Sequence, residues 1–281
     1  IFSILLFDIF YEFHNGQNIL GFISENKKRI VSFFKDEQVV GAFINGFIFI
    51  IIGFLFQKFE KKKNYEKLFI ILFVAFTIIG MVLTGERSNS IKLFLGLMIF
   101  FYFNDKIMLK HKIFFIISLL SLFIIIFNFL FSNHQRNHLK HRYYNDLVQR
   151  IIIKEKREKI LYFQLYNTAY EIFKENPYFG VGNKNYRIVT CKKGIDYVCN
   201  THPHQIYFEF LSEHGLVGTL VILSIIFFLI FKNYRKMLIK KNLIQIGCFS
   251  YLLTNFLPLL PSGSFFADFN ATFFWLNFSI Y

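Results

Sequence analysis

The residues best suited to chemistry gather around His202 and His204, which flank Pro203 and are followed by Glu209 and Glu213. Residues two apart cannot share one face of a helix and proline disfavours a helix interior, so the spacing predicts a loop with both imidazoles on one side. Imidazole titrates near neutral pH, so either ring could act as a general base. A lone histidine is usually structural, but two histidines with carboxylates beside an apolar segment favour a catalytic or binding site.

An apolar segment follows this loop and must help to position it. Ile206, Phe210 and Val217 recur at helical spacing, and Gly215 and Gly218 stand where the sequence becomes apolar. Glycines at such a position allow another helix to approach closely in lipid. We therefore expect the histidine loop to extend from a short helix that is docked on a helical bundle.

The composition excludes an ordinary soluble domain. Of the 281 residues, 54% are apolar and 21% are aromatic, and the mean hydropathy is +0.43. These values are typical of a polytopic membrane protein. The formal charge of +14 must then lie in loops, where it could orient the chain or attract anionic headgroups and phosphate-bearing substrates.

Hydropathy predicts an all-α, polytopic membrane helical bundle with one long extracytoplasmic loop that contains short helices. The end of a membrane helix is expected at 1–10, and seven spans are expected at 39–56, 68–84, 91–103, 113–131, 216–231, 243–260 and 265–281. This divides the chain into N-terminal transmembrane helices (1–131), a large extracytoplasmic loop with the histidines (132–215) and C-terminal transmembrane helices (216–281). Because the chain opens in an apolar run without an initiating Met, we expect an N-terminally truncated fragment.

Basic residues give an orientation for these spans. Lysines and arginines cluster in the short loops near 58–67, 106–112 and 232–241. Such loops stay cytoplasmic by preference, and all three fall on one face if each apolar segment crosses once. Arg87, the histidine loop and the turn at 258–264 then share the non-cytoplasmic face.

The expected extracytoplasmic loop is itself basic and contains Arg150 and Arg157. Mixed charges at helical spacing are typical of a solvated helix face, whereas a rim that attracts pyrophosphate would use the same cations. Both interpretations stay open. His134, His138 and His141 could share a helix face, but no Cys or carboxylate completes a ligand set, so no metal site is predicted.

Cysteine placement gives one further prediction. Cys191 and Cys199 bracket a short stretch of this loop, and an oxidising compartment would allow a disulfide between them. Cys248 lies within an apolar span and is expected to be an inert core residue.

Two sequence motifs resemble the O-antigen ligase and polymerase family of bacterial membrane glycosyltransferases. The family's ligases carry a histidine followed by Asn, Ser or Gln, nine residues, a Gly, two residues, a second Gly and Thr or Val. The residues that match this pattern are His204, Gln205, Gly215, Gly218 and Thr219. Upstream, Asn176-Pro177 followed by Gly180 and Gly182 is similar to the family's "NP, two apolar residues, GVG" turn. We expect these last two glycines to serve a tight turn and not a phosphate cradle.

The resemblance implies transfer of a glycan from undecaprenyl pyrophosphate to a sugar hydroxyl of lipid A-core, at the periplasmic face of the bacterial inner membrane. Neither a cofactor nor a metal is implied, and no nucleic acid partner is expected. The family's essential histidine corresponds to His204 and its phosphate-binding arginine to Arg87. Without the family match, Arg87 would equally fit an interface anchor.

Further residues are expected to contact the substrate. The family's second arginine does not keep its spacing, which leaves Arg150 or Arg157 as candidates to bind the phosphates. His202, Gln205 and Glu209 are expected to bind substrate. A polymerase that extends a glycan on its carrier lipid is the alternative function. A non-catalytic transporter is disfavoured because Asp268 is the main ionisable residue within the predicted spans.

Overall fold

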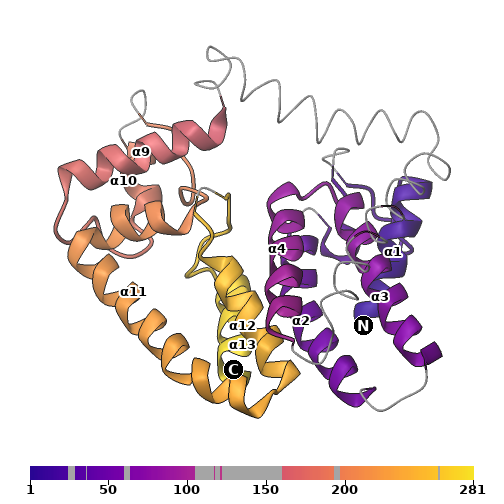
Figure 1. The fold of residues 1–281 in the computed structure, drawn as a ribbon. Helices are drawn as coiled ribbons and strands as arrows, with labels where there is room; N and C mark the ends of the chain where they lie inside the picture. The colour runs from indigo at the N-terminus through magenta and orange to yellow at the C-terminus, as the bar shows by residue number, and fades with distance from the viewer. Residues whose placement is uncertain are drawn as a thin grey trace. The chain divides into compact units, whose positions relative to one another are not determined.

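The computed structural model describes residues 1–24, 29–35, 37–59, 64–104, 117, 121, 160–192, 197–258 and 260–281. Among these residues the regular structure is helical and contains no strand, so the all-α prediction is confirmed for them (Figure 1). The elements are α1 (Phe2–Asn15), the short 3-10 helix η1 (Ser32–Phe34), α2 (Val40–Lys58), α3 (Asn64–Leu83), α4 (Arg87–Phe103), α9 (Leu161–Glu175), α10 (Tyr186–Lys192), α11 (Ile206–Lys240), α12 (Leu243–Asn255) and α13 (Asp268–Ile280).

The chain folds into two compact units, which we describe separately. The first comprises Ile1–Val148, Met237–Thr254 and Asn277–Tyr281, and the second comprises Gln149–Lys236 and Asn255–Leu276. The second unit contains the histidine loop and both motifs singled out in the sequence.

Glycines allow close packing of α2 in the first unit. A Cβ on Gly53 would overlap the backbone of Leu243, and one on Gly247 would overlap the backbone of Phe49. A Cβ on Gly96 of α4 would meet the ring of Phe49. Small residues at helix contacts are typical of membrane bundles, where backbones approach closely to gain van der Waals contact.

The lengths of the described helices support part of the predicted bundle. Two of them, α2 and α11, are long and apolar enough to cross a membrane, and a shorter apolar helix covers Leu68–Leu83. The helices α12 and α13 have 13 residues each and are shorter than the predicted spans at 243–260 and 265–281. The predicted span at 113–131 lies almost wholly outside the described residues. The seven-span topology and the three-part division therefore stay predictions.

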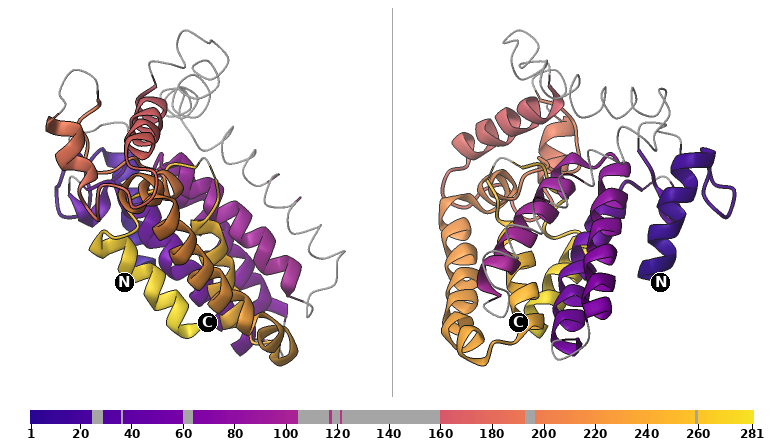
Figure 2. Two further views of the ribbon diagram at one scale, coloured as in Figure 1. Left: turned by 90° about the vertical axis from the view of Figure 1, so that its left-hand side faces the viewer. Right: turned by 45° about the vertical axis from the view of Figure 1, so that its right-hand side comes forward.

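In the second unit, α9 and α10 pack against the start of α11 and form the layer that carries the histidine loop. Ala169, Ile172 and Tyr186 are fully buried at its centre, and the ring of Phe208 stacks on Tyr166 with centroids 5.0 Å apart. In both figures α9 crosses above the long part of α11 and does not run alongside it (Figures 1 and 2). The amphipathic pattern of residues 165–174 in the sequence thus corresponds to most of α9.

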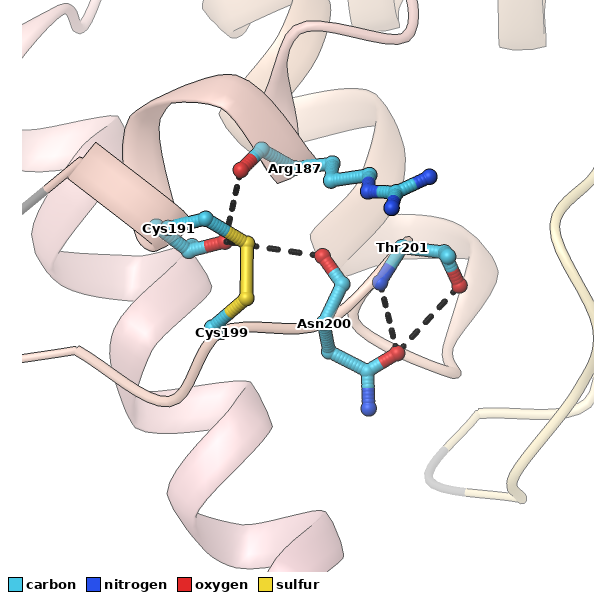
Figure 3. Close-up of a disulfide and its surroundings, with 6 residues drawn as sticks. Arg187, Cys191, Cys199, Asn200 and Thr201 are labelled. Atoms are coloured by element: carbon cyan, nitrogen blue, oxygen red, sulfur yellow. Dashed lines mark hydrogen bonds between the residues drawn. A yellow bond between two sulfur atoms is a disulfide. The ribbon is translucent and has the colours of Figure 1, made fainter. Parts of the chain in front are cut away.

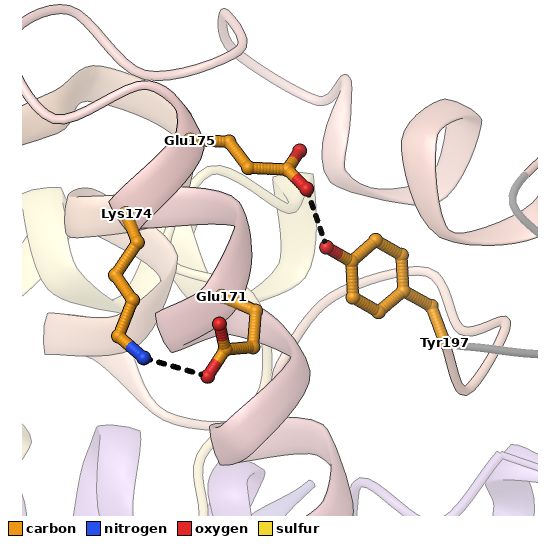
Figure 4. A network of polar contacts seen from close by, with 4 residues as sticks. All are labelled: Glu171, Lys174, Glu175 and Tyr197. Atoms are coloured by element: carbon orange, nitrogen blue, oxygen red, sulfur yellow. Dashed lines mark hydrogen bonds and ion pairs between the residues drawn. The ribbon is translucent and has the colours of Figure 1, made fainter.

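Polar contacts fix the end of α9. The helix ends at Glu175, immediately before Asn176 and Pro177, because proline disfavours a helical conformation of the residue before it. The Lys174 ammonium pairs with the Glu171 carboxylate at 2.9 Å, and the Tyr197 hydroxyl donates to Glu175 at 3.0 Å (Figure 4). The second contact ties the chain after α10 back to α9.

Candidate functional site

The two motifs, which are separate in the sequence, lie against each other in the second unit. The turn at 176–182 packs on the segment at 212–217. Backbone groups hydrogen-bond in both directions across the contact: Val181 N donates to Ser212 O at 3.0 Å, Gly182 N to Glu213 O at 2.8 Å, Leu216 N to Pro177 O at 2.8 Å and Val217 N to Tyr178 O at 3.1 Å. A ladder of backbone hydrogen bonds fixes the relative position of two segments more tightly than side-chain contacts alone. The turn therefore acts as a rigid support for the start of α11.

Glycines make this contact possible. A Cβ on Gly180 would overlap the backbone of Glu213, and a Cβ on Gly215 would overlap the backbone of Tyr178 and Phe179. Gly215 has φ 63° and ψ −168°, a conformation almost restricted to glycine, and it interrupts α11 with a kink.

The positions of the remaining motif glycines differ partly from the sequence expectation. Gly180 and Gly182 have φ of 65° and 95°, the left-handed geometry of a tight turn. The sequence predicted that a second helix would approach Gly215. In the structure its closest neighbour is instead the turn at 176–182. Similarly, a Cβ on Gly218 would meet the side chain of His214 within the same helix.

Glu213 extends the contact to α10. Its buried carboxylate accepts hydrogen bonds from Lys184 N at 3.0 Å and Tyr186 N at 3.3 Å. These are backbone donors at the start of α10, which have no partner within that helix. A negative charge is also favoured there by the helix dipole. Glu213 thus links α10, the turn at 176–182 and α11.

The histidine loop lies directly before α11. Residues 201–205 are not helical, and the ring centroids of His202 and His204 are 4.0 Å apart, so both imidazoles lie on one side as the spacing predicts. The backbone is not extended throughout, however, because His204 has φ 57°. A left-handed conformation is costly for a residue with a Cβ and is enriched at functional sites. The ring of Tyr162 meets that of His204 edge to face, with centroids 5.7 Å apart.

The two histidines differ in their surroundings. His202 Nδ1 lies 2.9 Å from Thr201 Oγ1. The pKa of His202 is lowered from 6.5 to about 4, mainly by burial and also by the proximity of His204, while the backbone of Ser262 partly offsets both effects. His202 is therefore neutral at physiological pH, and the side chains of both histidines are half-buried.

A second turn also holds the histidine loop, and we call its residues 256–258 and 260–267 the C-terminal turn. Ser262 N donates to the carbonyl of His204 at 2.8 Å. The hydroxyl of Tyr207 donates to the carbonyl of Phe256 at 2.7 Å. The sequence placed 258–264 on the same face as the histidines but gave it no role. The serines beside Pro261, in an otherwise apolar region, were the sequence signal that could have predicted a role in holding the histidine loop.

Gln205 and Glu209, which were predicted to bind substrate, make structural contacts. The amide oxygen of Gln205 accepts from Tyr207 N at 2.8 Å and Phe208 N at 3.0 Å, and so caps the start of α11. The carboxylate of Glu209 accepts from the hydroxyl of Ser264 and from Phe265 N at 2.9 Å. Both side chains are buried, so their contribution to substrate binding stays a prediction.

A disulfide joins Cys191 to Cys199 beside this loop, with Cα atoms 4.5 Å apart (Figure 3). Thr190 donates to the carbonyl of Arg187 at 3.3 Å and to that of Asn200 at 3.5 Å. The disulfide and the second hydrogen bond connect the end of α10 to the residues immediately before Thr201. The histidine loop is thus held at its N-terminal side as well.

The predicted phosphate-binding arginines are not among the described residues of the second unit. Arg87 is half-buried at the first position of α4, in the first unit. The preceding Glu86 accepts hydrogen bonds from Gly41 N at 2.8 Å and from Asn89 Nδ2 at 2.6 Å, which joins the starts of α2 and α4. Arg150 and Arg157 lie outside the described residues, as do His134, His138 and His141. In the part of the chain that the structure describes, no three His, Cys, Asp or Glu side chains gather to hold a metal ion.

Comparisons with known proteins extend this picture. The model of the O-antigen ligase family matches residues 72–223, which is more than half of the chain and includes Arg87, the turn at 176–182 and the histidine loop. A search of curated proteins finds no match. The family match confirms the resemblance seen in the two sequence motifs, and the chain belongs to the O-antigen ligase family.

Proposed function

We propose that this protein is a membrane glycosyltransferase that moves a glycan from undecaprenyl pyrophosphate to a sugar hydroxyl of lipid A-core. The reaction takes place at the periplasmic face of the bacterial inner membrane and needs neither a metal nor another cofactor. Membership of the O-antigen ligase family supports an enzyme of this kind and a lipid-linked glycan as substrate.

One observation carries the proposal. His204, the histidine of the ligase motif, lies on a loop that is held at both ends, and the pKa of the adjacent His202 is lowered to about 4. Such rigid support is what a general base needs, because proton transfer depends on the distance and direction of the acceptor nitrogen.

The proposed chemistry balances as a displacement at the anomeric carbon. His204 accepts the proton of the acceptor hydroxyl while the oxygen forms a bond to the anomeric carbon of the glycan. The bond from that carbon to the pyrophosphate oxygen breaks, and undecaprenyl pyrophosphate leaves with the electron pair. The proton on His204 then passes to solvent. Because His202 is neutral, it adds no repulsion to the imidazolium that forms.

The leaving group must also be stabilised. Arg87 is proposed to bind the pyrophosphate, since its planar guanidinium can donate to two phosphate oxygens and keeps its charge. Arg150 or Arg157 would supply a second cation. The disulfide between Cys191 and Cys199 supports the periplasmic placement, because such bonds persist in oxidising compartments.

A polymerase of the same superfamily, which would extend the growing glycan on its carrier lipid, is the second candidate. The ligase is favoured because Gln205, Gly218 and Thr219 follow the ligase pattern.

Product analysis in a strain without its own ligase tests the proposal. Expression of the protein should yield glycan attached to lipid A-core. Longer glycan on undecaprenyl pyrophosphate would indicate the polymerase, and no change in either product would contradict both. Arg87→Lys should lose the product, because an ammonium keeps the charge without the bidentate fork. Arg187→Lys, at an exposed arginine of α10, is the matched control and should retain it.

A further inference from the structure

The turn at 176–182 carries two large aromatic side chains that the proposed chemistry does not use. Tyr178 and Phe179 are 68% and 75% exposed. Their backbone is nevertheless held in place, because Tyr178 O accepts a hydrogen bond from Val217 N and the carbonyl before it accepts one from Leu216 N. A turn that is fixed in its backbone but leaves two aromatic rings uncovered presents them to something outside the chain.

The turn at 176–182 contacts α11 at the point where the exposed apolar face of that helix begins. Leu216 and Val217, which bond the turn, are the first residues after the kink and are themselves 47% and 44% exposed. The exposed apolar face continues along the helix through Leu220, Val221, Ile225 and Phe228. Only 22% of the most apolar stretch of α11 is buried within the molecule. The two aromatic rings are therefore continuous with the face of α11 that would contact lipid.

The other exposed face of this layer is different. From Gln164 to its end, the exposed residues of α9 all carry a polar group, namely Gln164, Asn167, Tyr170, Lys174 and Glu175, whereas the exposed Leu161 and Phe163 at its start are apolar. The Lys174 ammonium lies 4.6 Å from the centre of the Tyr170 ring. This face is suited to water. Aromatic side chains at the end of a membrane helix, with a polar face beyond them, match the environment at the boundary between headgroups and acyl chains.

We propose that Tyr178 and Phe179 insert into the lipid–water interface and anchor the second unit on the membrane surface. The partner is the phospholipid bilayer itself, and the inference rests on the proposed crossing by α11. The same turn is bonded to Ser212 and Glu213, within the short helix that carries the histidine loop. The anchor therefore sets the height of His204 above the bilayer. This height must bring His204 close to the pyrophosphate of a carrier lipid that is embedded in the membrane.

Depth-dependent fluorescence quenching tests this anchor. Trp275 is the single tryptophan of the sequence, so Trp275→Phe provides a background for one new tryptophan at a time. Tyr178→Trp and Phe179→Trp are the test variants. Phe228→Trp, at a 65% exposed position further along α11, reports on the crossing, and Tyr170→Trp on α9 is the aqueous control. Each protein is reconstituted in phosphatidylcholine vesicles brominated at a shallow or a deep acyl position.

The anchor predicts blue-shifted emission at positions 178 and 179, quenched more by shallow than by deep bromines. Position 228 should show the reverse preference, and position 170 should respond to aqueous iodide alone. Iodide quenching at 178 and 179 like that at 170 would overturn the anchor. Blue-shifted emission that no bromolipid quenches would place the rings in a protein contact, such as a second copy, and would overturn it too. Absence of bromine quenching at 228 would refute the crossing by α11, and the anchor with it.

Discussion

His202 and His204 are two residues apart and equally half-buried, yet they have different neighbours. The ring of His202 bonds Thr201 and its pKa is lowered to about 4, while the ring of His204 meets that of Tyr162. A proton on one ring disfavours a proton on the other, because their centroids are only 4.0 Å apart. The lowered pKa makes His202 a weak base, which favours His204 as the general base and His202 as the residue that orients the loop.

The lowered pKa of His202 predicts acid sensitivity. The folded-state pKa is about 4 and the ordinary value is 6.5, so the unfolded chain binds more protons between these values. The contribution of neutral His202 to stability is present above pH 6.5 and is lost as the pH falls toward 4. His202→Gln should therefore reduce the loss of melting temperature between pH 7 and pH 5. An unchanged pH dependence in this variant would show that His202 is not the responsible group.

Ser264 is predicted to matter because it bonds a buried carboxylate. Removing one partner of such a bond costs roughly 1–3 kcal/mol, since Glu209 stays buried with one donor fewer. Ser264→Ala should lower the melting temperature and the rate of glycan transfer together. The control is Ser250→Ala, where a buried hydroxyl bonds only the carbonyl of Ile246 within α12. Equal effects of the two changes would argue against a supporting role of the C-terminal turn.

At the scale of elements, the site consists of short segments joined by backbone hydrogen bonds, by the carboxylate of Glu213 and by a disulfide. The turn at 176–182 bonds the kink of α11, Glu213 caps α10, and the disulfide joins α10 to the histidine loop. None of these segments is long enough to be stable alone. Each is ordered by its neighbours, so a change at one contact should affect the whole support.

Gly215 provides the sharpest test of that support. Gly215→Ala would place a residue with a Cβ in a nearly glycine-only conformation, at a cost of about 1–3 kcal/mol, and would also collide with the turn. Glycan transfer should fall strongly even if the protein accumulates. In the control Gly16→Ala, φ is 76° but a Cβ would meet nothing within 4 Å, so only the backbone cost applies. Similar losses in melting temperature would indicate that the turn does not press on Gly215.

The disulfide can be tested separately. Cys191 and Cys199 should resist alkylation until a reductant is added, whereas buried Cys248 should react only after unfolding. Cys191→Ser should destabilise the loop by roughly 2–3 kcal/mol, because the closed ring is short. Equal alkylation of the pair with and without reductant would contradict the bond.

Local patterns in the sequence predicted individual elements well. The apolar run at 39–56 corresponds to α2, the amphipathic pattern at 165–174 to α9, and the proline between two histidines to a loop. The contacts between distant segments were not predictable in this way. Glu209 finds its partners 55 and 56 residues further along the chain, and the left-handed His204 depends on contacts made by its neighbours. Such pairings are set by tertiary packing, which periodicity does not record.

For the whole molecule, the basic loops predict which face each part occupies. Lys236 lies at the end of α11 and is expected in the cytoplasm, while Asn183, in the segment that follows the turn at 176–182, is expected in the periplasm. Lys236→Cys and Asn183→Cys, each in a chain without its three native cysteines, should react oppositely with a membrane-impermeant reagent in intact cells. Labelling of position 183 only after permeabilisation of the inner membrane would reverse the orientation and remove the site from its proposed substrate.

The most direct measurement is the rate at which purified, reconstituted protein transfers glycan from undecaprenyl pyrophosphate, compared between the wild type, His204→Ala and His202→Ala. Loss of a general base costs about 10²- to 10⁴-fold in rate. The transfer rate of His204→Ala should therefore fall by at least about 10²-fold, while its melting temperature stays near that of the wild type. His202→Ala should retain more activity. Near-normal transfer by His204→Ala with an inactive His202→Ala would identify His202 as the base, and near-normal transfer by both would show that the histidine loop does not catalyse the reaction.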